Sequence, residues 1–163
     1  MHKPKLSCIY LDMDGVIADF VKRYKELFKI SPEQTRDKKR FYGYFDKFIE
    51  DNNFATLEMM PGAPALIDFL SKASVPTHIL SSTASPERHD IISKQKMMWL
   101  QSHGITFNPV FVPGKSRKKE YAAPDKLIID DTESVINDWR AAGGLAIWHK
   151  DVPTTLAMLN MYV

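Results

Sequence analysis

The sequence has a single cysteine and lacks any long uninterrupted apolar run among its 163 residues. Cys8 lies in a short apolar run and is expected in the core. A single cysteine can form neither an intramolecular disulfide nor a cysteine-based zinc site. This cysteine content fits a reducing compartment. No stretch approaches the ~20 apolar residues that cross a bilayer, and Asp12 and Asp14 interrupt the first run, so a signal peptide is not expected. These absences predict a soluble, cytoplasmic protein without a membrane partner.

An excess of one charge sign is also missing. Lys and Arg number 22 against 20 Asp and Glu, a formal net charge of +2 that is too small to indicate nucleic-acid binding from bulk charge. Hydrophobic residues make up 44% and charged residues 26%, which is typical of a globular chain. We therefore expect one compact domain whose electrostatic function, if any, is local.

Short apolar runs alternate with segments of helical spacing along the chain. The runs are typical of buried strands and cover 6–11, 77–80, 127–129 and 145–148, with a weaker run at 110–112. The helical segments cover 63–72, 86–103 and 133–142, and glycines follow the last two. This alternation predicts an α/β fold with a Rossmann-like, doubly wound parallel sheet, which binds ligands beyond the carboxyl ends of its strands.

The stretch 20–60 interrupts the alternation because it is rich in aromatic and charged residues and has no strand-like run. At about 40 residues it is too long for a plain loop. We therefore predict a small helical cap inserted after the first strand, between core segments 1–19 and 61–163.

Acidic pairs follow two of the predicted strands. Asp12 and Asp14 follow the first, and Asp130 and Asp131 follow the run at 127–129. Carboxylates at the ends of buried strands are costly unless a cation or hydrogen bonds compensate them. If the two strands are neighbours, four carboxylates converge, and oxygen ligands of this kind suit Mg²⁺.

Each acidic pair has a simpler interpretation when taken alone. Asp-x-Asp-Gly is a common turn, and Asp130-Asp131 can cap the following helix. An EF-hand loop would need Asp or Asn where Val16 stands and Glu where Arg23 stands, so that interpretation fails. Two acidic strand ends in one sheet are hard to explain by capping, which favours the metal site.

Hydroxyl and basic residues lie where a phosphate would need them. Ser81 and Ser82 follow the strand at 77–80. Hydroxyl and backbone N–H groups at such a position can hold phosphate oxygens. The ordinary alternative is a loop with a helix cap. The basic run 115–119 lies just ahead of the second acidic strand. A solvated surface is the default interpretation for most of that run.

Residues 9–20, Ile-Tyr-Leu-Asp-Met-Asp-Gly-Val-Ile-Ala-Asp-Phe, resemble the first motif of the haloacid dehalogenase (HAD) superfamily. The resemblance continues in order through Ser81, a lysine at 118 or 119, and Asp130-Asp131. Within the superfamily, the chain is similar to the 5'(3')-deoxyribonucleotidases and their small phage and bacterial relatives through 53–63, the Lys-x-x-Trp segment at 96–99, and the strand at 127–131. Ser81 stands where that family often has Thr, and the insertion is short.

The resemblance implies a covalent mechanism. Asp12 would be the nucleophile that forms an aspartyl-phosphate, and Asp14 would be the general acid and base. Mg²⁺ would bind a carboxylate oxygen of Asp12, the backbone carbonyl of Asp14 and the carboxylate of Asp131, with Asp130 as a further ligand or acting through water.

The resemblance also implies a phosphate site. Met13, Ser81 and Ser82 would contact the phosphate. Lys118, with Lys119 as the second choice, would neutralise the charge shared by Asp12 and the phosphate, and Lys115 is a less expected choice.

The resemblance implies a Mg²⁺-dependent phosphomonoesterase that hydrolyses a small phosphorylated substrate, a (deoxy)nucleoside monophosphate above all. One alternative is a 3'-phosphatase whose basic runs at 36–40 and 115–119 hold a polynucleotide end; another is a non-catalytic Mg²⁺-binding module with the same fold. The cap aromatics at helical spacing favour a small core of their own. The alternative is that Phe20, Phe45 or Phe54 faces the site and stacks on a base.

Overall fold

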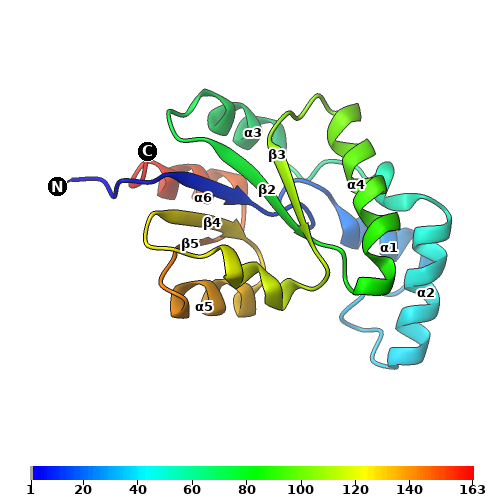
Figure 1. The fold of residues 1–163 in the computed structure, drawn as a ribbon. Helices are drawn as coiled ribbons and strands as arrows, with labels where there is room; N and C mark the ends of the chain where they lie inside the picture. The colour runs from blue at the N-terminus through cyan, green and yellow to red at the C-terminus, as the bar shows by residue number, and fades with distance from the viewer. Residues whose placement is uncertain (1) are drawn as a thin grey trace.

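A five-stranded sheet with the order β3-β2-β1-β4-β5 forms the centre of the molecule (Figure 1). The computed structural model describes residues 2–163. Every neighbouring pair of strands is parallel, so all carboxyl ends lie at one edge, and the predicted doubly wound sheet is confirmed. The strands are β1 (Cys8–Leu11), β2 (Thr77–Ser82), β3 (Asn108–Val112), β4 (Lys126–Asp130) and β5 (Leu145–Trp148).

The central strand β1 sets the level of the functional edge. Its last residue, Leu11, pairs with Ile79 of β2 on one side and with Ile129 of β4 on the other. The residues that follow Leu11 and Ile129 are Asp12 and Asp130, so the register places both carboxylates at the same level of neighbouring strands.

Helices cover both faces of the sheet because the strand side chains alternate between two cores. Ile9 and Leu11 belong to the larger core, which includes α3 (Ala63–Lys72), α4 (His89–Ser102) and α6 (Val152–Leu159). Tyr10 packs against the smaller core on the other face, which includes α5 (Glu133–Ala141).

Several element boundaries differ from the sequence prediction. β1 begins at Cys8, and β2 continues to Ser82, so both serines belong to the strand rather than to the following loop. The predicted helix at 86–103 is divided into a 3₁₀ turn, η2 (Pro86–Arg88), followed by α4. Cys8 is buried as expected. Within the described residues, no helix combines the length and the apolar character needed to cross a bilayer.

The stretch 20–60 forms α1 (Phe20–Phe28), α2 (Lys38–Glu50) and the 3₁₀ turn η1 (Asn53–Ala55), beside α4 (Figure 1). Its aromatic rings pack on one another, for example Phe28 on Tyr44 with ring centroids 4.4 Å apart. Gln95 joins this stretch to α4, because its side chain donates to the Ile49 carbonyl and accepts from the Phe54 amide. The division into a cap and a core stays a prediction.

Candidate active site

Three carboxylates meet at the carboxyl edge of the sheet. Asp12, Asp130 and Asp131 each offer an oxygen within 4.8 Å of the other two. Asp12 and Asp130 are 6% and 0% exposed, whereas Asp131 is exposed. The neighbouring positions of β1 and β4 thus bring together two acidic segments that are more than a hundred residues apart in the sequence.

A tight turn after β1 places Asp14 beside this cluster. The Met13 carbonyl accepts hydrogen bonds from the amides of Val16, Ile17 and Ala18. Gly15 has a φ of +81°, and a Cβ atom at this position would overlap the Oδ2 atom of Asp131. Only glycine satisfies both the backbone conformation and the space that Asp131 occupies.

Lys118, on the 3₁₀ segment η3 (Lys115–Tyr121), is the cation of the cluster. Its Nζ atom lies 2.9 Å from Asp12 Oδ1 and 2.7 Å from Asp130 Oδ2, and the residue is 2% exposed. Lys119 is exposed instead. Of the two lysines that the sequence left open, the structure therefore brings Lys118 to the carboxylates.

Burial and charge shift the protonation of this cluster. Desolvation, and then repulsion from the Asp130 carboxylate, raise the pKa of Asp12 well above its ordinary value although Lys118 opposes them. Burial alone would lower the pKa of Lys118, but the carboxylates of Asp12 and Asp130 outweigh it, so its pKa is raised and it stays charged. Negative charge is in excess at this edge of the sheet.

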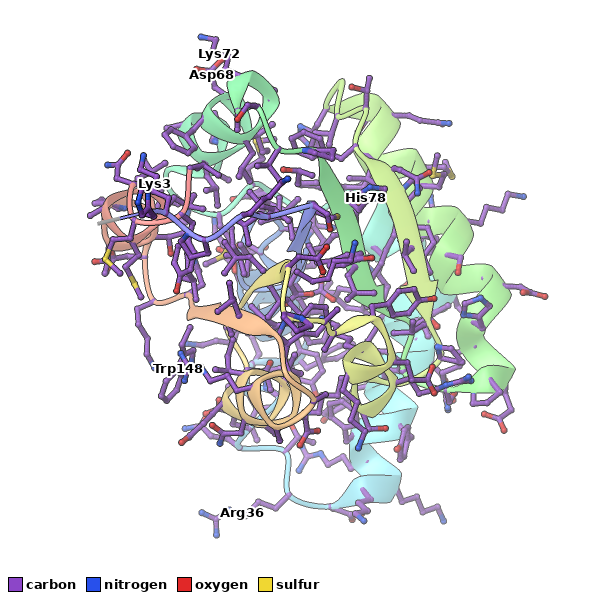
Figure 2. All side chains as sticks on the ribbon, turned by 60° about the vertical axis from the view of Figure 1, so that its left-hand side comes forward. Lys3, Arg36, Asp68, Lys72, His78 and Trp148 are labelled. Atoms are coloured by element: carbon purple, nitrogen blue, oxygen red, sulfur yellow. The ribbon has the colours of Figure 1, made fainter. Side chains whose placement is uncertain are left out.

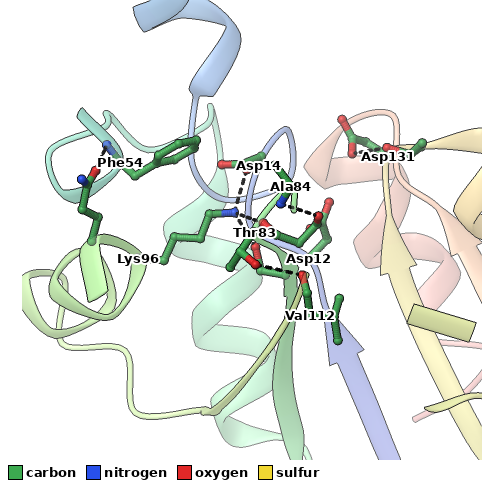
Figure 3. Close-up of polar contacts among 12 residues, drawn as sticks. Asp12, Asp14, Phe54, Thr83, Ala84, Lys96, Val112 and Asp131 are labelled. Atoms are coloured by element: carbon green, nitrogen blue, oxygen red, sulfur yellow. Dashed lines mark hydrogen bonds and ion pairs between the residues drawn. The ribbon is translucent and has the colours of Figure 1, made fainter. Parts of the chain in front are cut away.

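A second buried lysine holds Asp14. Lys96 Nζ donates to Asp14 Oδ2 at 2.9 Å, to Ser81 Oγ at 2.7 Å and to the Ser82 carbonyl at 2.8 Å (Figure 3). The sequence motifs did not predict a role for Lys96. The sequence did contain a sign of this buried position. The residues three or four positions from Lys96 on the same helix face are apolar, namely Ile92, Trp99 and Leu100. A charge on the buried face of a helix requires a partner.

The residues predicted to contact phosphate occupy different depths. Ser82 lines a cavity at the carboxyl edge of the sheet. Ser81 is fully buried, and its hydroxyl accepts the hydrogen bond from Lys96. The Met13 side chain is also buried, in the larger core, so a contact from Met13 to a ligand would come from its backbone.

A cavity of about 300 Å³ opens above the carboxylates. Of the three aromatic side chains proposed to face a ligand, Phe20 lines it, whereas Phe45 and Phe54 are 6% and 4% exposed and pack within the 20–60 stretch. Polar and apolar groups therefore share one cavity, with apolar side chains next to the charged cluster. Its lining consists of Asp12, Asp14, Gly15, Phe20, Val21, Ser82, Lys115, Lys118, Asp131, Thr132 and Val135.

The donors at this edge fit a Mg²⁺ ion. The candidate metal-ligating atoms are all oxygens. No backbone amide of the described residues donates to the Asp14 carbonyl, so this oxygen is free to bind a cation. Both oxygens of Asp130 are already engaged, one by Lys118 and the other by the Thr132 amide. Asp131, exposed and lining the cavity, is the better placed carboxylate on β4's end.

The parallel sheet, the acidic strand ends around a buried lysine and a family match together assign the protein to the phosphomonoesterases of the HAD superfamily. Residues 6–152 match the family model described as 5' nucleotidase, deoxy (pyrimidine), cytosolic type C protein. The chain belongs to this family, and the resemblance noted in the sequence is confirmed. No curated protein matches the chain.

Solved structures share the fold at low sequence identity. A hydrolase from Streptococcus pneumoniae TIGR4 is 14% identical with a TM-score of 0.56, over 96% of this chain and 99% of that one. A HAD-superfamily hydrolase from Ehrlichia chaffeensis is 14% identical with a TM-score of 0.52, over 90% and 87%. A wild-type HAD family enzyme from Bacteroides thetaiotaomicron, in complex with magnesium and inorganic phosphate, is 14% identical with a TM-score of 0.51, over 93% and 98%.

Proposed function

We propose that this protein is a Mg²⁺-dependent nucleotidase that hydrolyses (deoxy)nucleoside monophosphates through an aspartyl-phosphate on Asp12. The observation that carries the proposal is the placement of Asp12 between Lys118 and the Asp130-Asp131 pair at the floor of the cavity. A carboxylate in this position is poised to meet a phosphate, and both a lysine and a cation site stand beside it to balance the charge.

In the first step, a carboxylate oxygen of Asp12 attacks phosphorus and the bond from phosphorus to the ester oxygen breaks. The leaving oxygen takes a proton from Asp14. Lys96 occupies Asp14 Oδ2, whereas Oδ1 is buried without a partner among the described residues, so we assign the proton transfer to Oδ1. Lys118 stays charged and neutralises the negative charge that Asp12 and the phosphoryl group share.

In the second step, Asp14 accepts a proton from water while the water oxygen attacks phosphorus. The bond from phosphorus to Asp12 breaks, which releases inorganic phosphate and restores the Asp12 carboxylate. Asp14 thus returns to its protonated state at the end of the cycle.

Asp12, the Asp14 carbonyl and Asp131 would hold Mg²⁺. When bound, the ion supplies positive charge that keeps Asp12 ionised despite the desolvation that raises its pKa, and that lowers repulsion between Asp12 and an anionic substrate. Asp130, already bonded to Lys118 and Thr132, would act on the ion through water.

The form of the cavity supports a nucleoside monophosphate as substrate. Phe20 and Val21 line the cavity alongside the acidic cluster, so a phosphate near Asp12 leaves its organic group near an apolar side. Phe20 stacks on Phe54 with their planes 6° apart, which fixes the ring as a surface for a base. Membership of a 5' nucleotidase family supports the same substrate class.

The test is a phosphate-release screen with Mg²⁺ over nucleoside monophosphates, sugar phosphates and 3'-phosphorylated oligonucleotides. We expect turnover of nucleoside monophosphates that EDTA and Asp12→Asn both abolish. Preference for the oligonucleotides, with a rate that falls steeply with salt, would instead indicate the polynucleotide 3'-phosphatase. Mg²⁺ binding without turnover of any substrate would leave the non-catalytic module.

A further inference from the structure

The indole of Trp148 is bonded to the backbone of a candidate metal ligand. Trp148 is the last residue of β5 and pairs in register with Asp130 of β4. Its Nε1–H group donates to the carbonyl oxygen of Asp131, the next residue along, at 3.0 Å. Figure 2 shows Trp148 at the margin of the molecule, and its side chain is half-buried.

This bond lies just beyond the last backbone bond between β4 and β5, in which the His149 amide donates to the Asp130 carbonyl. The β4–β5 ladder ends at the pair Asp130–Trp148, so Asp131 is the first residue beyond it. No backbone amide of the described residues donates to the Asp131 carbonyl. The indole N–H therefore pairs a carbonyl that receives no backbone amide, and it fixes the peptide that follows the Asp131 side chain.

Besides a hydrogen bond with the Asp12 carboxylate, the Asp131 side chain has few partners among the described residues. The Thr132 hydroxyl lies 3.4 Å from its Oδ1 atom, and the carboxylate occupies the space above Gly15. The indole, in turn, is held in place by Lys150, whose Nζ atom lies 3.3 Å from the ring centroid. An ammonium over an aromatic face is attracted by the ring quadrupole, so Lys150 restrains the ring that restrains Asp131.

We propose that Trp148 is a positioning residue for the Mg²⁺ site, acting through the backbone of Asp131. The proposal rests on the proposed function in one respect, that Asp131 binds the ion. Hydrogen bonds that orient metal ligands typically contribute 10–100-fold to metal affinity. Because this bond reaches the ligand's backbone rather than its carboxylate, we expect loss of the indole N–H to weaken Mg²⁺ binding by about 10-fold, the lower end of that range.

The experiment compares Trp148→Phe, which keeps an aromatic ring but removes the donor, with Trp139→Phe. Trp139 is a matched control, because its indole also donates to a backbone carbonyl of β4. The acceptor is Lys126, at the end of β4 away from Asp131, and the distance is 3.3 Å. The full chain is titrated with Mg²⁺ alone by calorimetry, and phosphatase activity is measured against Mg²⁺ concentration. We expect Trp148→Phe to raise the Kd for Mg²⁺ about 10-fold with kcat recovered at saturating Mg²⁺, and Trp139→Phe to leave the Kd unchanged.

Fluorescence of the unmutated protein gives an independent readout. Trp99 and Trp139 are fully buried, so Trp148 is the tryptophan whose emission should respond when Mg²⁺ reaches Asp131. We expect an emission change that saturates with the calorimetric Kd and persists in Trp139→Phe.

The outcomes separate the two proposals. If the unmutated chain binds no Mg²⁺, the metal site of the proposed function fails. If it binds Mg²⁺ but Trp148→Phe binds equally well, or Trp139→Phe weakens binding as much, the positioning role of Trp148 is overturned and the metal site stands. A calorimetric signal without any emission change also counts against the role of Trp148.

Discussion

The ammonium group of Lys96 lies 2.9 Å from Asp14 Oδ2, although the two residues are 82 positions apart in the sequence. The same nitrogen also binds the Ser81 hydroxyl and the Ser82 carbonyl at the end of β2. One buried charge on α4 thus connects the acidic turn after β1 to the polar end of β2, the two segments on which the proposed proton transfer and phosphate contact depend.

Replacing Lys96 should separate these segments. We expect Lys96→Met to lower kcat by about 10²-fold, because Asp14 and Ser82 lose the group that fixes their relative position. Lys94→Met is the matched control, since Lys94 is an exposed lysine on the same helix and should leave kcat unchanged. Steady-state kinetics on both variants check this, and equal activities would show that Lys96 is only structural.

Lys118 and Lys119 should differ sharply in stability as well as in activity. Lys118→Met leaves the buried carboxylates of Asp12 and Asp130 without their cation, which should cost about 3–5 kcal/mol of unfolding free energy. Lys119 is exposed, and Lys119→Met should change the free energy of unfolding by no more than about 0.5 kcal/mol. Urea unfolding of both variants measures these two changes in the free energy of unfolding. A similar, small change in both would contradict the buried ion pairs.

Gly15→Ala should affect metal binding more than its backbone strain explains. An alanine Cβ would displace the Asp131 carboxylate, so we expect weaker Mg²⁺ affinity and reduced activity. Gly143→Ala is the control, because Gly143 also has a positive φ, +94°, but open space around it. Calorimetric titration with Mg²⁺ distinguishes the two; an unchanged affinity in Gly15→Ala would show that Asp131 can move without consequence.

Removing the charge of Asp12 should stabilise the metal-free protein. The pKa of Asp12 in the folded state is raised above its ordinary 3.8, so its contribution to stability is complete below pH 3.8 and is lost as the pH rises through the folded-state pKa. Asp12→Asn should therefore raise the Tm at pH 7 in EDTA by roughly 2–4 °C, which is about 1 kcal/mol at this chain length.

The gain should shrink as the pH falls through the folded-state pKa of Asp12, and it should be gone below pH 3.8, where Asp12 is neutral in both states. The exposed Asp68, paired with Lys72, offers a control, because Asp68→Asn should give no gain. Thermal unfolding of the unmutated protein and both variants, from pH 7 to below pH 4, tests the direction of the change in Tm. A lower Tm for Asp12→Asn at pH 7 would contradict the excess of negative charge.

Local pattern determined much of this molecule from sequence alone. Apolar runs bounded by turns located all five strands, and the acidic residues that follow two of them indicated the functional edge, because carboxylates at the ends of buried strands need compensation. The order of the motifs indicated the superfamily, and the segments 53–63, 96–99 and 127–131 indicated the family that the family model confirms.

Tertiary structure decided what spacing could not. Lys118 and Lys119 are adjacent in the sequence, and only the path of η3 turns one of them toward Asp12. Lys96 and Asp14 are joined by packing between α4 and the turn after β1, and the bond from Trp148 to Asp131 depends on where β5 ends beside β4. Contacts between distant segments follow from strand order and register, which the periodicity of a single segment does not encode.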